Sequence, residues 1–449
     1  MNKQDKRYTT YVQILKEELV PAMGCTEPIA IAYAAAKARN ILEKLPERVE
    51  VMVSNNIIKN VKSVVVPNTG GLRGIEAAAA AGLVAGREEL KLEVISKVSE
   101  EQKAEMLSFL ENTPIEVSAL DNEEVFDILI ILYHEGDVAK VRISQHHTNI
   151  VYTERNGEVL FWAEKAKDDA AVSESALPTQ GKLTAGCQEA DTEAGVADRG
   201  LLNLQDILDF ADTCDISDVK DVLDTQIRYN MMISEEGLLG DYGANIGSTM
   251  LKAYGNDVRN RAIAKAAAGS DARMSGCELP VIINSGSGNQ GITVSVPVIE
   301  YAKELGVPKE KLYRALIISN LTAIHGKTGI GTLSAYCGAV SAGCAAGCGI
   351  AYLHGGGYAE LAHTLVNSIV IVSGIICDGA KPSCAAKIAS SVEAGILGYH
   401  MYMNGQEFKS GDGIVDNGVE ATIRNVGRLG KEGMRETDKE IVKIMLDEV

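Results

Sequence analysis

The chain has 449 residues, of which 46% are hydrophobic and 23% are charged, and its formal net charge at pH 7 is −18. The length allows a large core and two or three domains of about 150 residues each. The negative charge repels phosphate backbones and anionic membrane surfaces, so we expect neither a nucleic-acid nor a membrane partner. Aromatic residues make up only 5%, which predicts a core built from Ala, Val, Ile, Leu and Gly.

The segment from Met1 to Leu19 is partly basic but contains no apolar stretch of the kind found in a secretory signal. The most apolar run, residues 365–377, is shorter than the roughly 20 residues that span a bilayer, so we interpret it as a buried helix. Cysteine occurs nine times, an odd number that argues against a disulfide framework. Together these features predict a cytoplasmic protein.

The N-terminal half mixes helical and strand-like patterns. Residues 8–45 have a helical pattern that Pro21, Gly24 and Pro28 interrupt, so Cys25 is expected at a bend just before a helix. Residues 126–162 predict a four-strand meander with turns at residues 135–137 and 156–157. The segments between them alternate in type: strand-like 47–60, 61–68, 90–95 and 114–120, and helical 69–86 and 99–112.

Residues 164–200 have no sustained period and are interpreted as a connector or lid. Beyond residue 201 the chain is largely helical, apart from strand-like segments at 279–284 and 292–298. We therefore predict an α+β fold. An N-terminal α+β region with an antiparallel sheet (residues 1–200) would precede a large Ala/Gly-rich helical domain (residues 201–449).

Three cysteines of the helical half lie at expected helix ends or turns. Cys337 precedes a helix on which Cys344 and Cys348 recur as buried core residues, and Cys377 and Cys384 flank a turn. Three thiolates from two segments can hold three irons of a cubane cluster and leave the fourth open. Zinc also suits soft sulfur ligands, and unliganded structural thiols are the third alternative.

Two other features are candidates for chemistry. Cys25, next to a helix N-terminus, is a candidate base or nucleophile, although a cysteine in a turn can also be inert. The glycine loop Ser285, Gly286, Ser287, Gly288, Asn289 and Gln290 presents N–H groups that can bind a carboxylate, or is simply a turn. It matches G-x-G-x-x-G, but residues 292–298 alternate like a strand, so we discount a nucleotide.

His146 and His147 fall on an expected strand, where only one of them can face a shared pocket. His325 lies just before another glycine-rich break. The sequence does not decide whether any of the three contacts a substrate.

Five motifs together resemble the L-cysteine desulfidase group of the iron-sulfur L-serine dehydratase superfamily. They are PAMGCTEP, NTGGLRG, INSGSGNQG, AYCGAVSAG and CDGAKPSC, and they run from the first helices to the segment after Cys384. The resemblance implies that Cys337, Cys377 and Cys384 ligate a 4Fe-4S cluster, that Cys25 is a thiolate base, and that residues 285–290 bind the substrate. The separate β domain of serine dehydratases, with its serine-rich motif, is not visible.

The reaction implied by this resemblance is α,β-elimination of L-cysteine to pyruvate, ammonia and sulfide without pyridoxal phosphate. The same elimination on L-serine is the nearest alternative, and a non-catalytic metal- or amino-acid-binding protein is another. We expect a small amino acid as the partner molecule and leave a homo-oligomer open.

Overall fold

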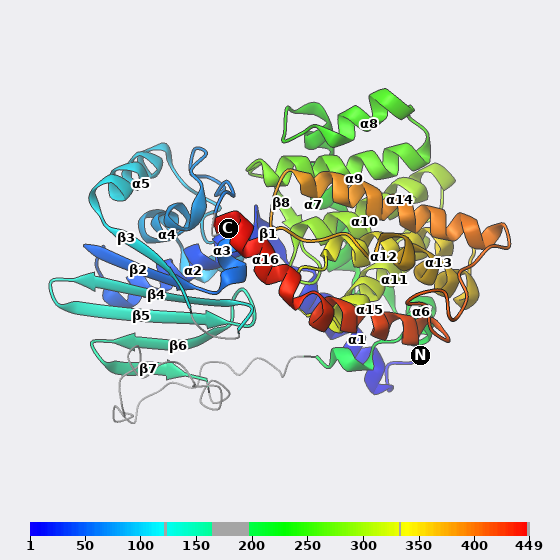
Figure 1. Cartoon of the computed structure of the whole chain (residues 1–449), viewed down its shortest axis with the longest axis horizontal. Coiled ribbons are helices and arrows are strands. Elements are labelled where there is room, and N and C mark those ends of the chain that lie inside the picture. Colours follow the sequence, from blue (N-terminus) through cyan, green and yellow to red (C-terminus); the bar gives the residue numbers. More distant parts are fainter. Residues whose placement is uncertain (121–123, 164–196, 332–333, 447–449) are drawn as a thin grey trace. The chain divides into compact units, whose positions relative to one another are not determined.

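The computed structural model describes residues 1–120, 124–163, 197–331 and 334–446 (Figure 1). The chain forms two compact units: residues 23–195 make one, and residues 1–22 together with 196–449 make the other. We call them the sheet unit and the helical unit. The α+β fold class is confirmed. The predicted division at residue 200 differs from these units at the N-terminus, because the segment Met1–Ala22 belongs to the helical unit.

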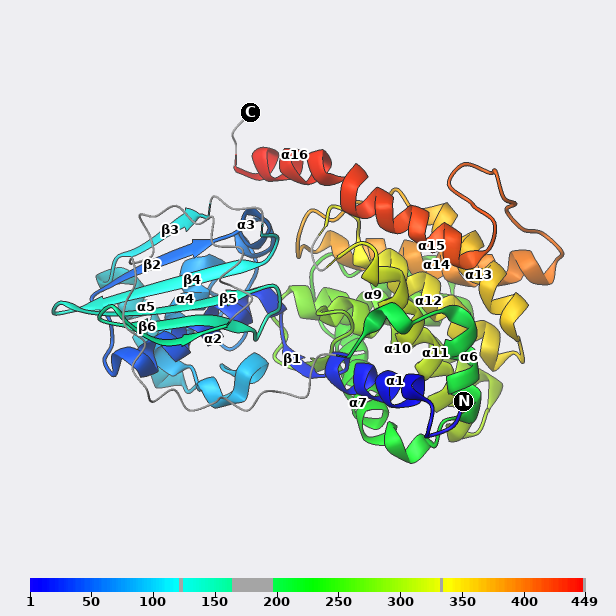
Figure 2. The same cartoon turned by 90° about the horizontal axis from the view of Figure 1, so that it is seen from below.

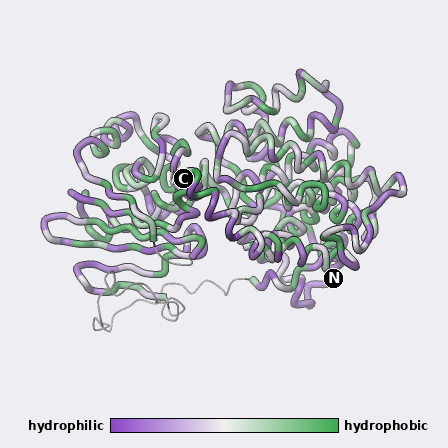
Figure 3. Tube along the Cα trace, viewed as in Figure 1, coloured by the Kyte–Doolittle hydropathy of each residue, from purple (hydrophilic) through white to green (hydrophobic). Residues whose placement is uncertain are grey.

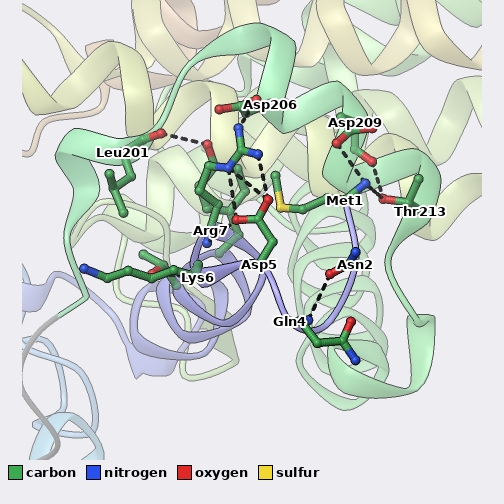
Figure 4. Close-up of polar contacts among 12 residues, drawn as sticks. Met1, Asn2, Gln4, Asp5, Lys6, Arg7, Leu201, Asp206, Asp209 and Thr213 are labelled. Carbon is green, nitrogen blue, oxygen red and sulfur yellow. Dashed lines mark hydrogen bonds and ion pairs between the residues drawn. The ribbon is translucent and has the colours of Figure 1, made fainter.

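The N-terminal segment Met1–Ala22 is fastened to the helical unit by polar contacts. In helix α1 (Lys6–Glu18), Arg7 forms an ion pair of 2.8 Å with Asp206 of α6 (Leu204–Thr213). The N-terminal amino group lies 2.8 Å from Asp209 of the same helix, as Figure 4 shows. Sequence periodicity predicts a helix but not the element against which it packs. These long-range contacts identify α6 as one such element.

The sheet unit contains a six-stranded sheet in the order β3-β2-β4-β5-β6-β7. Strand β3 runs parallel to β2, and the other neighbours are antiparallel. Helices α2 and α4 pack against these strands, and Figure 2 shows them behind the sheet. The strands are β2 (Arg48–Val53), β3 (Ile115–Ala119), β4 (Asp127–His134), β5 (Asp137–Ser144), β6 (Ile150–Arg155) and β7 (Glu158–Trp162).

The meander predicted for residues 126–162 is confirmed as β4 to β7. Its two hairpin turns, Glu135-Gly136 and Asn156-Gly157, have positive φ at both central residues, which matches the twist of antiparallel strands. The polar turns stand out as hydrophilic tips beside the apolar strands (Figure 3). The helices of this unit are α2 (Thr26–Leu42), α3 (Asn55–Val61), α4 (Gly74–Ala85), the 3₁₀ segment η1 (Glu88–Glu93) and α5 (Glu100–Asn112).

The helical unit is arranged around α12 (Gly338–Leu353), which packs against α10, α11, α13 and α14 (Figure 1). Small residues let these helices approach closely. A Cβ on Gly347 would lie 2.5 Å from the carbonyl oxygen of Gly395 on α14, so only glycine fits there. The neighbouring helices are α9 (Val258–Met274), α10 (Gly288–Leu305), α11 (Lys309–Thr328), α13 (Tyr358–Val372) and α14 (Ser383–Met403).

Shorter elements complete the helical unit. Strand β8 (Pro280–Ile282) pairs with β1 (Pro21–Met23) in a two-stranded sheet. The remaining elements are η3 (Arg199–Leu201), η4 (Ile216–Asp218), α7 (Lys220–Leu239), α8 (Ile246–Tyr254), α15 (Val419–Arg428), the π-helical η5 (Leu429–Gly433) and α16 (Arg435–Leu446). No helix in the described part of the chain is long and apolar enough to cross a membrane.

Several strand predictions are wrong. Residues 292–298 lie inside helix α10, residues 90–95 fall largely in η1, and residues 55–61 form helix α3. Helix α10 is buried from Gln290 to Ala302 on all sides, so its β-branched residues show no helical period although they sit in a helix. The predicted connector at 164–200 lies mostly outside the described residues, as does Cys187.

Candidate functional site

The structure brings Cys337, Cys377 and Cys384 together at one end of two neighbouring helices. Cys337 is the N-cap residue of α12, and Cys384 lies in the first turn of α14. Cys377 is held beside Cys337 by backbone hydrogen bonds: its N–H donates to Ala335 at 2.6 Å, and the Cys337 N–H donates to Ile375 at 3.1 Å. These two backbone hydrogen bonds therefore bring together two thiols that are far apart in sequence.

The three thiols act on one another electrostatically. A hydrogen bond with Cys377 and burial raise the pKa of Cys337 well above its usual value, and the charge that Cys377 or Cys384 would carry raises it further. Burial also raises the pKa of Cys384. Three such groups resist ionising together unless a cation joins them, because their negative charges repel in a poorly solvated site. The donor set thus fits a metal centre bound through thiolates.

The sulfur donors suit two kinds of metal centre. Thiolates bind a single zinc ion, and they also bind the irons of an iron-sulfur cluster.

A lysine accompanies the cysteines. Lys387, one turn after Cys384 on α14, forms an ion pair with Asp378. Burial acts to lower the pKa of Lys387, but the hydrogen bond to Asp378 and the nearby Cys384 and Cys337 raise it overall. Lys387 thus keeps a positive charge next to a site whose ligands are negative when they bind metal.

The glycine loop follows β8 and leads directly into α10. Ser285 and Gly286 have φ of 49° and 76°, and the Ser285 hydroxyl donates to Asn284 Oδ1 at 2.9 Å. Asn284 is fully buried and donates to Asn320 Oδ1 at 3.0 Å, and Asn320 in turn bonds Gln226. A buried network of amides therefore fixes the loop, which agrees with a binding role and exceeds what a simple surface turn requires.

A helix, α10, follows the glycine loop, so the strand expected at residues 292–298, on which a nucleotide was discounted, is wrong. A dinucleotide site also needs a parallel βαβ unit. Here α10 is followed by α11, and β8 pairs only with β1 in the described part of the chain. A nucleotide therefore remains unsupported, for a different reason.

The glycine loop and the cysteines meet within the helical unit. A Cβ on Gly338 would lie 2.6 Å from both Cδ and Nε2 of Gln290, so the Gln290 side chain rests against the residue that follows Cys337. The Oε1 of Gln290 and the Oδ1 of Asn289 are buried and have no hydrogen-bond partner among the residues that the structure describes. The loop thus presents unpaired amide oxygens beside the end of α12 that carries a thiol.

Cys25 lies in the sheet unit as the N-cap residue of α2. Gly24 precedes it with φ of 58°, and a Cβ at Gly24 would lie 2.2 Å from Pro67 Cγ, so the bend needs glycine. The Cys25 thiol is buried and donates to Oε2 of Glu27 at 3.0 Å. Asn60 donates to the other oxygen of Glu27 at 3.0 Å. The thiol therefore has a carboxylate as a direct proton acceptor.

The other candidates have local roles. His146 and His147 lie in the bend between β5 and β6 rather than on a strand, and His147 packs edge-on against Phe126. His325 bonds Glu420 at 2.7 Å. Cys344 and Cys348 are fully buried on α12, as predicted, and burial raises the pKa of Cys344 to about 12.

Sequence reasoning missed two polar residues. Glu27 follows Cys25 by two positions, so the pair was visible in the sequence as a thiol and an acid in one first turn. Arg273, near the end of α9, is 3% exposed and touches the glycine loop. It lies in an Ala-rich helix among other charged residues, so no signal in the sequence distinguished it.

Comparison with known proteins adds relatives for the whole chain. A UPF0597 protein of Desulfitobacterium hafniense is 58% identical over 448 residues, covering 100% of this chain and 99% of that protein. UPF0597 proteins of Lachnoclostridium phytofermentans and Treponema denticola are 50% and 45% identical, each over at least 98% of this chain and 100% of the relative. These names state no substrate.

The sequence model of the serine dehydratase alpha chain family matches residues 89–443, a range that includes the glycine loop and all three converging cysteines. This match agrees with the superfamily resemblance and suggests a dehydratase- or lyase-type activity. Members of this family are typically iron-sulfur enzymes. The chain belongs to the serine dehydratase alpha chain family.

Proposed function

We propose that the protein eliminates the β-substituent of a small amino acid, with L-cysteine as substrate and sulfide, pyruvate and ammonia as products. The observation that carries this proposal is the meeting of Cys337, Cys377 and Cys384 beside the loop residue Gln290. Three thiols that could bind a metal and a set of polar groups that could bind an amino acid thus lie near one end of α12. The family match supports the reaction class, and the five motifs favour cysteine.

Cys337, Cys377 and Cys384 would hold a 4Fe-4S cluster, with Lys387 offsetting part of the negative charge of the ligands. When bound, such a cluster with one open iron supplies a Lewis acid for a soft leaving group such as sulfide. The helix N-termini at Cys337 and Cys384 favour anionic sulfur, because the unpaired N–H groups of a first turn carry partial positive charge.

Cys25 is the proposed base for the Cα proton. Its thiol already donates to the Glu27 carboxylate, which can accept the proton and leave a thiolate. General-base catalysis of this kind contributes roughly 10²- to 10⁴-fold to the rate. The loop Ser285 to Gln290 would hold the amino acid in one orientation, which lowers the barrier to elimination.

L-Serine is the second candidate, because the matching family is named for serine dehydratase. The deciding experiment measures sulfide and pyruvate release from L-cysteine and pyruvate release from L-serine, using protein purified and assayed without oxygen. We expect kcat/KM for cysteine to exceed that for serine at least about tenfold, in line with a better leaving group. Faster pyruvate formation from serine would overturn the choice of substrate.

The same assay distinguishes an enzyme from a non-catalytic binding protein. A Cys25→Ala variant should keep its iron and lose turnover if the enzyme proposal holds. A wild-type protein that binds iron but releases neither product from either amino acid would contradict it.

A further inference from the structure

We propose that Arg273 is the carboxylate-binding residue of an α-amino acid site formed with the glycine loop. This inference deepens the proposed function, on which it rests for the identity of the reaction but not for the binding step. Arg273 lies in the last turn of α9, and its side chain is 3% exposed. No hydrogen bond or ion pair engages the guanidinium within the part of the chain that the structure describes.

The guanidinium lacks partners on one particular edge. Its Nε and Nη2 are both buried, and no described residue offers either of them a hydrogen-bond acceptor. These two nitrogens point their N–H bonds in the same direction, which is the fork that binds both oxygens of a carboxylate. A permanent positive charge buried without an anion is strongly unfavourable, so this edge indicates an anionic ligand.

The edge lies against the glycine loop. A Cβ on Gly288 would lie 2.4 Å from Nε of Arg273, so the absence of a side chain at this position makes room for the guanidinium. Neither nitrogen is accessible to solvent in this conformation. A carboxylate must therefore displace the loop residues that lie against the Arg273 guanidinium. The contact that it replaces gives neither the Nε–H nor the Nη2–H group a hydrogen-bond acceptor.

The same loop supplies the complementary groups. Asn289 Oδ1 and Gln290 Oε1 are buried acceptors to which no residue in the described ranges donates. An ammonium group has three N–H donors to offer them. Two donors on Arg273 and two acceptors on the loop match the two charged groups of an α-amino acid. Gln290 also touches Gly338, which places this set next to Cys337.

The experiment measures equilibrium binding of L-alanine, which has no leaving group at Cβ and so cannot be turned over. Alaninamide has the same side chain and ammonium group but no carboxylate. We expect wild-type protein to bind alanine far more tightly than alaninamide. Arg273→Gln should weaken alanine binding about 30- to 100-fold and leave alaninamide unchanged, because one charge-assisted bidentate contact is lost.

Arg261→Gln is the matched control, since Arg261 lies on the same helix but is paired with Glu304 at 2.7 Å. It should keep the preference for alanine. Arg273→Lys retains the charge without the fork and should fall between wild type and Arg273→Gln. If Arg273→Gln fails to fold, the Lys variant and the acetate experiment below decide.

Acetate and acetamide test the carboxylate site without any amino acid. Acetate should raise the Tm of wild-type protein more than acetamide or chloride does, and the Lys variant should lose much of this increment. Equal effects of acetate and chloride, or equal binding of alanine and alaninamide by wild type, would overturn the inference. If alanine binding depends on Arg273 but cysteine yields no sulfide, the proposed reaction fails and the inference stands. If cysteine yields sulfide but alanine binding does not depend on Arg273, only the inference fails.

Discussion

The thiol of Cys25 donates a hydrogen bond to Oε2 of Glu27, with 3.0 Å between sulfur and oxygen. Cys25 is the N-cap residue of α2 and Glu27 lies in its first turn, and both side chains are buried. Asn60 and Thr26 also donate to the Glu27 carboxylate. A thiol that serves as a base must first lose its proton, and Glu27 is the acceptor in direct contact. This pair leads to the first prediction.

Glu27→Gln should reduce kcat for amino-acid elimination roughly 10- to 100-fold with little change in KM, within the range of general-base effects. The amide keeps the shape and one acceptor oxygen but cannot take the thiol proton. Steady-state kinetics across pH would show this loss as a lower plateau in the plot of kcat against pH. Glu76→Gln, an exposed acid in the first turn of α4, is the control and should retain wild-type kinetics. A Glu27 variant within twofold of wild type would remove Glu27 from the mechanism.

The second prediction concerns the three cysteines that we propose as metal ligands. Replacing Cys337, Cys377 or Cys384 by Ser should each remove most of the iron and acid-labile sulfide from protein purified without oxygen, because oxygen is a poorer ligand for this kind of cluster. Cys344→Ala is the control on the same helix, and it should keep the iron at a stability cost of about 1–2 kcal/mol for lost packing. Iron retained by all three Ser variants, or zinc in place of iron in wild type, would contradict the assignment.

The third prediction uses the contact between Gly338 and Gln290. Gly338→Ala would bring its Cβ to 2.6 Å from Gln290 Cδ, so the amide must move away from the end of α12. We expect a higher KM and a loss of about 1–3 kcal/mol in stability from overpacking. Gly326→Ala on α11 is the matched control, since its Cβ meets nothing closer than 3.7 Å. It should be neutral or stabilising by about 0.5–1 kcal/mol, and unchanged KM in the Gly338 variant would sink the idea.

The fourth prediction is a pH dependence of stability at Asp271. Burial raises the pKa of this carboxyl from 3.8 to about 6, although Oδ2 accepts hydrogen bonds from the N–H groups of Ile246 and Gly247 that begin α8. Between pH 4 and 6 the native state therefore holds a proton that the unfolded state has released. The free energy of unfolding falls as the pH rises through this window, by up to about 3 kcal/mol.

Asp271→Asn cannot ionise, and its side-chain oxygen can still accept from α8. The stability difference between this variant and wild type should be near zero at pH 4 and should favour the variant at pH 7. Thermal unfolding at pH 4, 5, 6 and 7 measures the difference. A difference that stays constant over this range would show that Asp271 does not titrate there.

Much of the fold could be predicted because local signals agreed with tertiary structure. The meander was found because Glu135-Gly136 and Asn156-Gly157 specify hairpin turns between alternating strands. Helix α10 was missed because its residues are buried on every side, so Val294, Val296 and Val298 suggest a strand by type and alternation. Tertiary packing, which a local pattern does not contain, decides such segments.

The site was predicted in part. The convergence of Cys337, Cys377 and Cys384 in one place agrees with expectation, although their role as ligands stays a prediction. Arg273 could not be found from sequence, because its proposed role rests on one edge of its guanidinium that meets no acceptor in the described part of the chain. That property appears only after the loop from β8 folds back onto α9.

The glycine contacts between α12 and α14 have a consequence for handling the protein. A Cβ on Gly395 would lie 2.3 Å from the carbonyl oxygen of Gly343, so the two helices touch through their main chains. Their cysteine-bearing ends are thus held in register by direct main-chain contact. If the protein carries the proposed cluster, loss of the cluster in air should leave the chain folded, and reductant with ferrous iron and sulfide should restore its colour without a refolding step.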